Sequence, residues 1–291
     1  MLFANNKISL RHCGSFFFIL LLCLFSLGIQ SLYAETGKIA LVISNSEYRY
    51  GKPRHNIAND AQNMTNVLKQ LGFEVTLRMN LNYRAMENAI YEFTNRLRNV
   101  PQSTGLFYFA GHGAQGQRQH FLVPVNNFYI RSERHLKFKA VSVNQIIEDM
   151  TTASSKSIII LDACYEKPYN YRNAQSLCDG LTTKPLPFSN QSGFIIAYPH
   201  EETIRGRNIY TKTLVRILKR AIKKRIGIKR IFMRLDATVD RKSYGRQVPW
   251  HQHINLDYFS LGGIRTPKKT QQCRCCTGGF FTTCYSCPCQ N

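Results

Sequence analysis

The stretch Ile158-Ile159-Ile160-Leu161-Asp162-Ala163-Cys164 decides the fold. Four consecutive bulky apolar residues, three of them β-branched, predict a strand that is buried on both faces. The aspartate and the cysteine then stand at the carboxyl end of the strand, where open α/β sheets place their reactive groups. Cys164 is therefore a candidate nucleophile. The alternative is a small apolar cysteine packed in the core.

Strands and helices alternate on both sides of this stretch. Apolar runs of strand length occupy residues 39–43, 73–77, 106–110 and 193–198, and a short extended piece lies between Gln119 and Val125. Helical periodicity covers 143–150, 211–226, 228–239, a segment capped by Asn59-Asp60 and ended by Gly72, and a segment capped by Asn82 and stopped by Pro101. This alternation predicts an α/β sandwich of three layers, with a mostly parallel central sheet and helices on both faces.

A second reactive residue follows strand 106–110, within Gly111-His112-Gly113. Parallel strands of one sheet end at the same edge, so neighbouring strands would bring His112 and Cys164 together. A cysteine nucleophile needs a base near neutral pH, and imidazole is suited to that task. The flanking glycines leave the Gly113 amide available, with that of Cys164, as an oxyanion donor pair. The alternative is a turn histidine with no role.

Charge is strongly one-sided in this chain of 291 residues. The sequence has 39 Lys+Arg against 17 Asp+Glu, a net charge of +22, which predicts attraction to acidic partners. Residues 205–234 are rich in bases and contain no Asp or Glu. This segment is interpreted as the solvated face of helices on the sheet, and the alternative is a surface that binds anionic lipid or another polyanion. Few aromatic residues interleave these charges, so specific nucleic-acid recognition by stacking is not expected.

Residues 1–34 resemble a targeting segment. Lys7 and Arg11 precede an apolar run from Phe16 to Ile29, and cleavage is expected after Ala34, as in a signal peptide. The alternative is an uncleaved membrane anchor. Either way the body of the protein is expected outside the cytoplasm, in the periplasm or secreted.

Residues 261–291 combine a linker with a tail in which six cysteines lie between Cys273 and Cys289. On an exported chain without a large local core, this density predicts a disulfide knot. Zinc or another soft metal held by thiolates is the first alternative, and lipid attachment is another.

The residues in order also resemble a known family. The matching stretches are residues 39–45 with Tyr48, 59–61 with Met64, 71–75, 108–115, 122–124, 161–164, 210–211 and 245–250. Together they resemble the caspase-like cysteine peptidases, nearest to the prokaryotic metacaspase-type (orthocaspase) branch, over residues 38–260. Cys164 follows His112 by 52 residues, which agrees with the separation of about 50 residues typical of caspases.

The resemblance implies a caspase-like sandwich and a role for each matching site residue. Cys164 would be the nucleophile, His112 the base and Gly113 an oxyanion-hole amide. Asp162 would line the S1 pocket, where a carboxylate favours arginine or lysine at P1 in a peptide or protein substrate. The alternative for Asp162 is a capping carboxylate with no substrate contact.

The chain departs from the family pattern after the nucleophile. Tyr165-Glu166-Lys167 replaces the usual Arg-Asn-Asn, and segment 198–207 is short where relatives build part of the S1 pocket. The aperiodic stretch 165–192 predicts a long mobile loop, and its basic residues Lys167, Arg172 and Lys184 suggest self-processing.

No cofactor is predicted. The sequence contains no acidic run typical of a calcium site, and zinc is considered only for the tail. The alternative to an enzyme is a non-catalytic caspase-like domain bound to a membrane or polyanion through its basic helices and tail.

Overall fold

The computed structural model describes residues 37–49, 56–116, 119–127, 130, 132–166, 193–199, 209–256, 259–262, 272–277 and 283–288. The predicted targeting segment 1–34 lies outside these ranges, as do residues 167–192 of the predicted loop and most of the linker. Within the described ranges, no helix is long and apolar enough to cross a membrane.

A mostly parallel sheet forms the centre of the molecule, and its main strands lie in the order β2-β1-β3-β6-β7-β8. These strands are β1 (Lys38–Ser44), β2 (Glu74–Met79), β3 (Thr104–Gly116), β6 (Lys156–Glu166), β7 (Gly193–Tyr198) and β8 (Trp250–Ile254). All neighbours in this order pair in parallel except β8, which is antiparallel to β7. The strands β4 (Gln119–Leu122) and β5 (Val141–Ser142) extend the sheet beside the end of β3.

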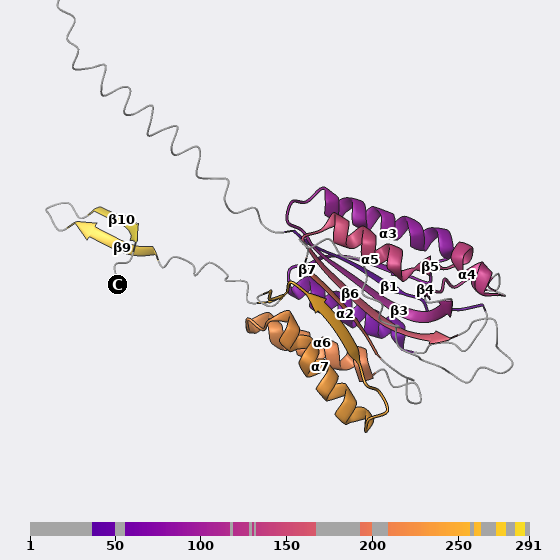
Figure 1. Ribbon diagram of the computed structural model, residues 1–291. Helices are drawn as coiled ribbons and strands as arrows, with labels where there is room; N and C mark the ends of the chain where they lie inside the picture. Colours follow the sequence, from indigo (N-terminus) through magenta and orange to yellow (C-terminus); the bar gives the residue numbers. More distant parts are fainter. Residues whose placement is uncertain are drawn as a thin grey trace, which may run out of the picture.

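Helices cover both faces of this sheet (Figure 1). One face carries α2 (Ile57–Gln70), α6 (Ile209–Lys223) and α7 (Ile228–Ser243). The other carries α3 (Tyr83–Arg98) and α5 (Val143–Ala153). The short α4 (Glu133–Lys139) packs near the end of β3, and the sequence pattern did not predict it. The three-layer α/β sandwich predicted from the alternation of elements is confirmed.

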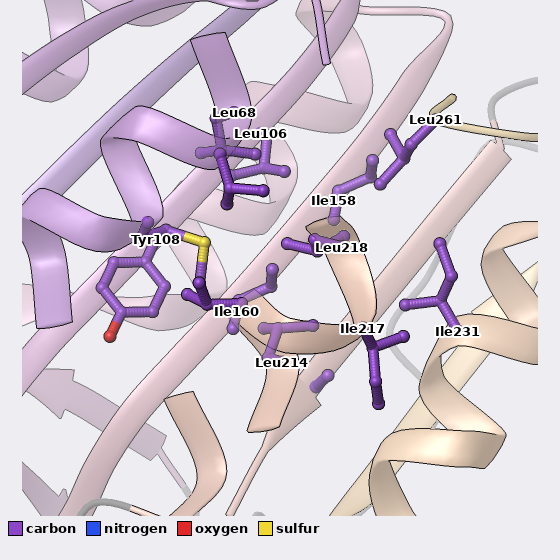
Figure 2. Packing of buried hydrophobic residues seen from close by; sticks show 14 of the residues in the cluster. Leu68, Leu106, Tyr108, Ile158, Ile160, Leu214, Ile217, Leu218, Ile231 and Leu261 are labelled. Carbon is purple, nitrogen blue, oxygen red and sulfur yellow. The ribbon is translucent and has the colours of Figure 1, made fainter. Parts of the chain in front are cut away.

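Strand alternation explains how one apolar run serves two cores. Successive side chains of a strand point to opposite faces. Ile158 and Ile160 of β6 accordingly belong to the core beneath α2, α6 and α7, whereas Ile159 and Leu161 belong to the core beneath α3 and α5. Figure 2 shows Ile158 and Ile160 among side chains of α2, α6 and α7, including Leu68, Leu214 and Ile231.

Helix starts and ends agree with the sequence in part. The Asn82 side chain accepts a hydrogen bond from the Ala85 amide at 2.9 Å, which confirms Asn82 as the N-cap of α3. Gly72 follows α2 with φ of 85°, a backbone conformation that glycine adopts without strain. The predicted cap at Asn59-Asp60 is wrong. Helix α2 begins at Ile57 after Asn56, and Asp60 is a buried residue of its first turn.

The cysteine-rich tail contains two strands that the sequence did not predict. β9 (Gln272–Thr277) and β10 (Thr283–Pro288) pair antiparallel, and their register sets Cys276 opposite Cys284 and Cys273 opposite Cys287. The side chains of this hairpin lie outside the described part of the structure. Disulfide formation and metal binding in the tail therefore stay predictions.

Candidate active site

Strand register brings the two candidate catalytic residues to neighbouring positions. β3 and β6 pair in parallel from Thr104 to Ala114, and His112 stands directly opposite Cys164. The described structure of Cys164 comprises its backbone and not its side chain. Two sequence motifs 52 residues apart thus meet on adjacent strands.

Both residues lie within strands rather than in loops after them, which differs from the sequence interpretation. β1 stops pairing with β3 at Ala110, but β4 then pairs antiparallel with β3 from Gly113 to Gly116. β6 also continues alongside β3 as far as Glu166. These non-local partners extend β3 and β6 beyond the apolar runs that predicted them. Gly113 is buried at this extension, opposite Leu122 on one side and Tyr165 on the other.

Tyr48 contacts both the backbone and the ring of His112. The His112 amide donates a hydrogen bond to the Tyr48 hydroxyl at 2.7 Å. The two rings lie with their centroids 4.3 Å apart, tilted by 57°. His112 is half-buried, so its ring is packed against Tyr48 and still partly exposed to solvent.

Val123 is hydrogen-bonded both to the His112 backbone and to Tyr48. The Tyr48 hydroxyl donates to the Val123 carbonyl at 3.2 Å, and the Val123 amide donates to the His112 carbonyl at 2.9 Å. Asn45 also donates to the Val123 carbonyl, at 3.3 Å. Sequence reasoning noted Tyr48 as a family match and did not predict this contact. Its position just past β1, the neighbour of β3, was the available signal.

Asp162 lies deep beneath the same edge of the sheet. The residue is 2% exposed. The Thr211 hydroxyl donates to Asp162 Oδ2 at 2.5 Å, and the Tyr108 hydroxyl donates to the same oxygen at 3.5 Å. Thr211 belongs to the first turn of α6, so the carboxylate also ties the start of this helix to β6.

The buried tyrosines around Asp162 stay protonated. Burial, followed by the charge of Asp162, raises the pKa of Tyr108 well above its usual value. Burial also raises the pKa of Tyr210, with smaller contributions from Asp236 and Asp162. Tyr108 has one hydroxyl hydrogen, and its oxygen lies closer to the Thr211 hydroxyl, at 2.8 Å, than to the Asp162 carboxylate.

The comparison with known families identifies the family of the chain. Residues 37–259 match the family described as the caspase domain. The chain belongs to the caspase-domain family. The candidate His112 and Cys164 pair therefore lies in a domain of a cysteine-type peptidase family.

Individual relatives of this caspase domain are distant. The human mucosa-associated lymphoid tissue lymphoma translocation protein 1 is 32% identical over 146 residues, which is 50% of this chain and 17% of that protein. Caspase-12 of Mus musculus is 32% identical over 76 residues, and caspase-13 of Bos taurus is 30% identical over 76 residues. Each match covers 26% of this chain, with 18% of caspase-12 and 20% of caspase-13. The chain spans about a fifth or less of these relatives.

The described part of the caspase domain contains no candidate metal site. Within it, no three His, Cys, Asp or Glu side chains are placed so that they could hold one metal ion. One pair of such residues joins β8 to α7. His251 Nδ1 of β8 lies 2.6 Å from Asp236 Oδ2 of α7, and the His251 ring stacks on the His253 ring with centroids 5.8 Å apart. This pair links α7 to β8 at the opposite side of β6 from His112.

Proposed function

We propose that this protein is a cysteine endopeptidase that cleaves peptide bonds after arginine or lysine. The observation that carries the proposal is the register that sets Cys164 opposite His112 within a caspase domain. A thiol beside an imidazole is the pair that acyl transfer by cysteine requires.

The reaction proceeds by acyl transfer in two halves. His112 accepts the proton of the Cys164 thiol, and the thiolate attacks the scissile carbonyl carbon. The backbone amides of Gly113 and Cys164 donate hydrogen bonds to the oxyanion of the tetrahedral intermediate. His112 returns its proton to the leaving amine as the peptide bond breaks, which leaves a thioester on Cys164. His112 then accepts a proton from water as the water attacks the thioester, and it passes this proton to the Cys164 thiolate as the acid product is released.

Asp162 supports the basic P1 preference. The hydroxyls of Thr211 and Tyr108 are uncharged donors, so hydrogen bonding by them does not neutralise the carboxylate. A buried negative charge two residues before the nucleophile attracts a guanidinium or ammonium group, because a low local dielectric strengthens the attraction.

We further propose that the chain belongs to the metacaspase-type (orthocaspase) branch that its motifs resemble. The leader-like residues 1–34 support export, and the cysteine density of residues 273–289 supports disulfides in the tail. Lys167, Arg172 and Lys184 offer sites for self-cleavage in the loop after Cys164, where tethering gives a high effective concentration. These three residues lie outside the described ranges.

Reporter peptides test the proposal. Purified wild type, Cys164→Ala and His112→Ala are assayed on reporters that end in arginine, lysine or aspartate. We expect cleavage of the two basic reporters by wild type and background rates from both variants. Equal rates for wild type and Cys164→Ala on every reporter would exclude peptidase activity. Mass spectrometry of the same samples reports cleavage in loop 165–192.

A second function is favoured by the charge of the α6–α7 surface. All the bases of this segment that the structure describes are exposed: Lys212, Arg216, Lys219, Arg220, Lys223, Lys224, Arg225, Lys229, Arg230 and Arg234. Arg220 and Arg234 also border a surface cavity of about 320 Å³ with Ile217 and Ile226. This face suits a non-catalytic role in binding an anionic membrane or polyanion.

Vesicle binding separates this function from the first. Cys164→Ala protein should sediment with vesicles containing anionic lipid and not with neutral vesicles, and salt should reverse binding. Binding that is independent of lipid charge would contradict the surface role.

A further inference from the structure

The hydroxyl of Tyr48 makes two hydrogen bonds beside His112, the candidate base. It accepts the His112 amide hydrogen at 2.7 Å and donates its own hydrogen to the Val123 carbonyl at 3.2 Å. The aromatic ring lies against the imidazole at 4.3 Å. One side chain therefore contacts both the backbone and the ring of His112, from a segment that precedes it by 64 residues.

The backbone at Gly111 is shaped around the same hydroxyl. A Cβ atom on Gly111 would collide with the Tyr48 hydroxyl and would approach the Phe109 ring to 2.7 Å. Glycine at this position thus allows the hydroxyl to reach the His112 amide. The glycine before the histidine has a local steric reason that is separate from substrate approach.

Tyr48 is itself held in place by backbone hydrogen bonds on both sides. The Asn45 amide donates to the Ala110 carbonyl at 2.9 Å, and the Ser46 amide donates to Asn80 Oδ1 at 2.9 Å. After Tyr48, the Arg49 amide donates to the Val125 carbonyl at 3.1 Å. These bonds fix the segment to β3, to the turn after β2 and to the chain after β4, so Tyr48 can serve as a rigid support.

We propose that Tyr48 is a positioning residue that holds the His112 imidazole in the orientation required for proton transfer with Cys164. The catalytic part of this inference rests on the proposed peptidase function. The positional part does not, because it concerns the orientation and mobility of the His112 ring. Loss of the hydroxyl removes one hydrogen-bond partner from the His112 amide and one from Val123, and the ring then loses its fixed support.

Kinetics of Tyr48→Phe and Tyr48→Ala test the catalytic part. Misplacement of a catalytic group by 1 Å costs on the order of 100-fold in rate, so we expect kcat to fall about 10-fold in Tyr48→Phe and about 100-fold in Tyr48→Ala. KM for the arginine reporter should stay within about two-fold, because a positioning residue acts on the chemical step rather than on substrate binding. Tyr91→Phe removes a hydroxyl from a tyrosine that is 67% exposed on α3 and should match wild type.

Histidine NMR tests the positional part without any activity. The His112 ring signal, assigned by its loss in His112→Gln, should show the ring-current shift of a close aromatic neighbour in wild type. It should broaden or move in Tyr48→Phe and lose the shift in Tyr48→Ala, with Tyr91→Phe unchanged. Identical His112 signals in wild type and Tyr48→Phe would overturn the inference, whatever the reporters show. Absence of cleavage by wild type with the expected NMR changes would instead reject the peptidase function alone.

Discussion

His112 and Asp162 lie near the carboxyl ends of the adjacent strands β3 and β6, and they are held in opposite ways. His112 is half-buried, and its backbone amide and carbonyl are bonded to Tyr48 and Val123. Asp162 is 2% exposed, and hydroxyls of Thr211 and Tyr108 bond its carboxylate directly. A base that exchanges protons needs a supported but accessible ring, whereas a carboxylate that supplies a fixed charge can be bonded tightly. The difference fits the two roles proposed for these residues.

The largest expected effect comes from the charge of Asp162. Asp162→Asn keeps the shape and the acceptor oxygen for Thr211 but removes the negative charge. Loss of one member of a buried charge pair costs several kcal/mol, so kcat/KM on the arginine reporter should fall about 1,000-fold, or about 4 kcal/mol. The measurement is the reporter assay, with Asp240→Asn on the exposed surface of α7 as the charge control. Cleavage retained in Asp162→Asn would assign Asp162 the alternative role of a capping carboxylate.

The stability of the region around His112 should depend on pH through His120. This residue of β4 pairs with Gln115 of β3, and burial lowers its pKa from 6.5 to about 4. Between these values the unfolded chain binds the proton and the folded protein does not. The free energy of unfolding should therefore be unaffected by His120 above pH 6.5 and fall by about 3 kcal/mol as the pH drops from 6.5 to 4.

Urea unfolding at pH 7 and pH 4.5 measures the contribution of His120 to the free energy of unfolding. His120→Phe cannot bind a proton, so its free energy of unfolding should fall less over this interval than that of wild type. Parallel pH profiles for the two proteins would contradict a buried, neutral His120.

A smaller effect is expected from the side-chain support of Asp162. Thr211→Val removes the hydroxyl that donates to Oδ2 with little change of shape. A hydrogen bond to a charged group contributes about 1.5–3 kcal/mol, so the free energy of unfolding should fall by about 2 kcal/mol.

Thr94→Val is the matched control for this change. Thr94 is 2% exposed and Thr211 is 0% exposed, but the Thr94 hydroxyl donates to the Ile90 carbonyl of its own helix at 3.0 Å. A neutral bond of this kind should cost about 1 kcal/mol or less. Equal losses in the two variants would mean that the hydroxyl of Thr211 does not stabilise a charged Asp162.

The main elements of the fold could be predicted from local sequence patterns. The run Ile158–Leu161 predicted a doubly buried strand, and Asn82 predicted a helix start, because burial period and capping act within a few residues. The cap of α2 was misplaced since Asn56 precedes the helix with a positive φ of 69° and its side chain makes no capping bond. The pattern therefore offered Asn59-Asp60 as the better signal, although Asp60 is buried inside the helix.

The sequence could predict that His112 and Cys164 lie close together, but not the residues that surround them. His112 and Cys164 could be placed at one edge because parallel strands end together. The extension of β3 by β4, the contact of Tyr48 with His112 and the bond from Thr211 to Asp162 join residues that are far apart in the sequence. No local period encodes such contacts.

The sequence by itself determined most of the strands and helices of the caspase domain, with α4 as an exception, and the order in which they alternate. It also determined which residue types stand near the carboxyl ends of β3 and β6. These properties follow from side-chain burial at fixed periods and from backbone preferences of single residues. Only the tertiary structure decided that Cys164 stands opposite His112, that Tyr48 contacts His112 and that hydroxyls bind Asp162. Strand register and side-chain packing are set by the whole chain at once, because each contact depends on where its distant partner lies.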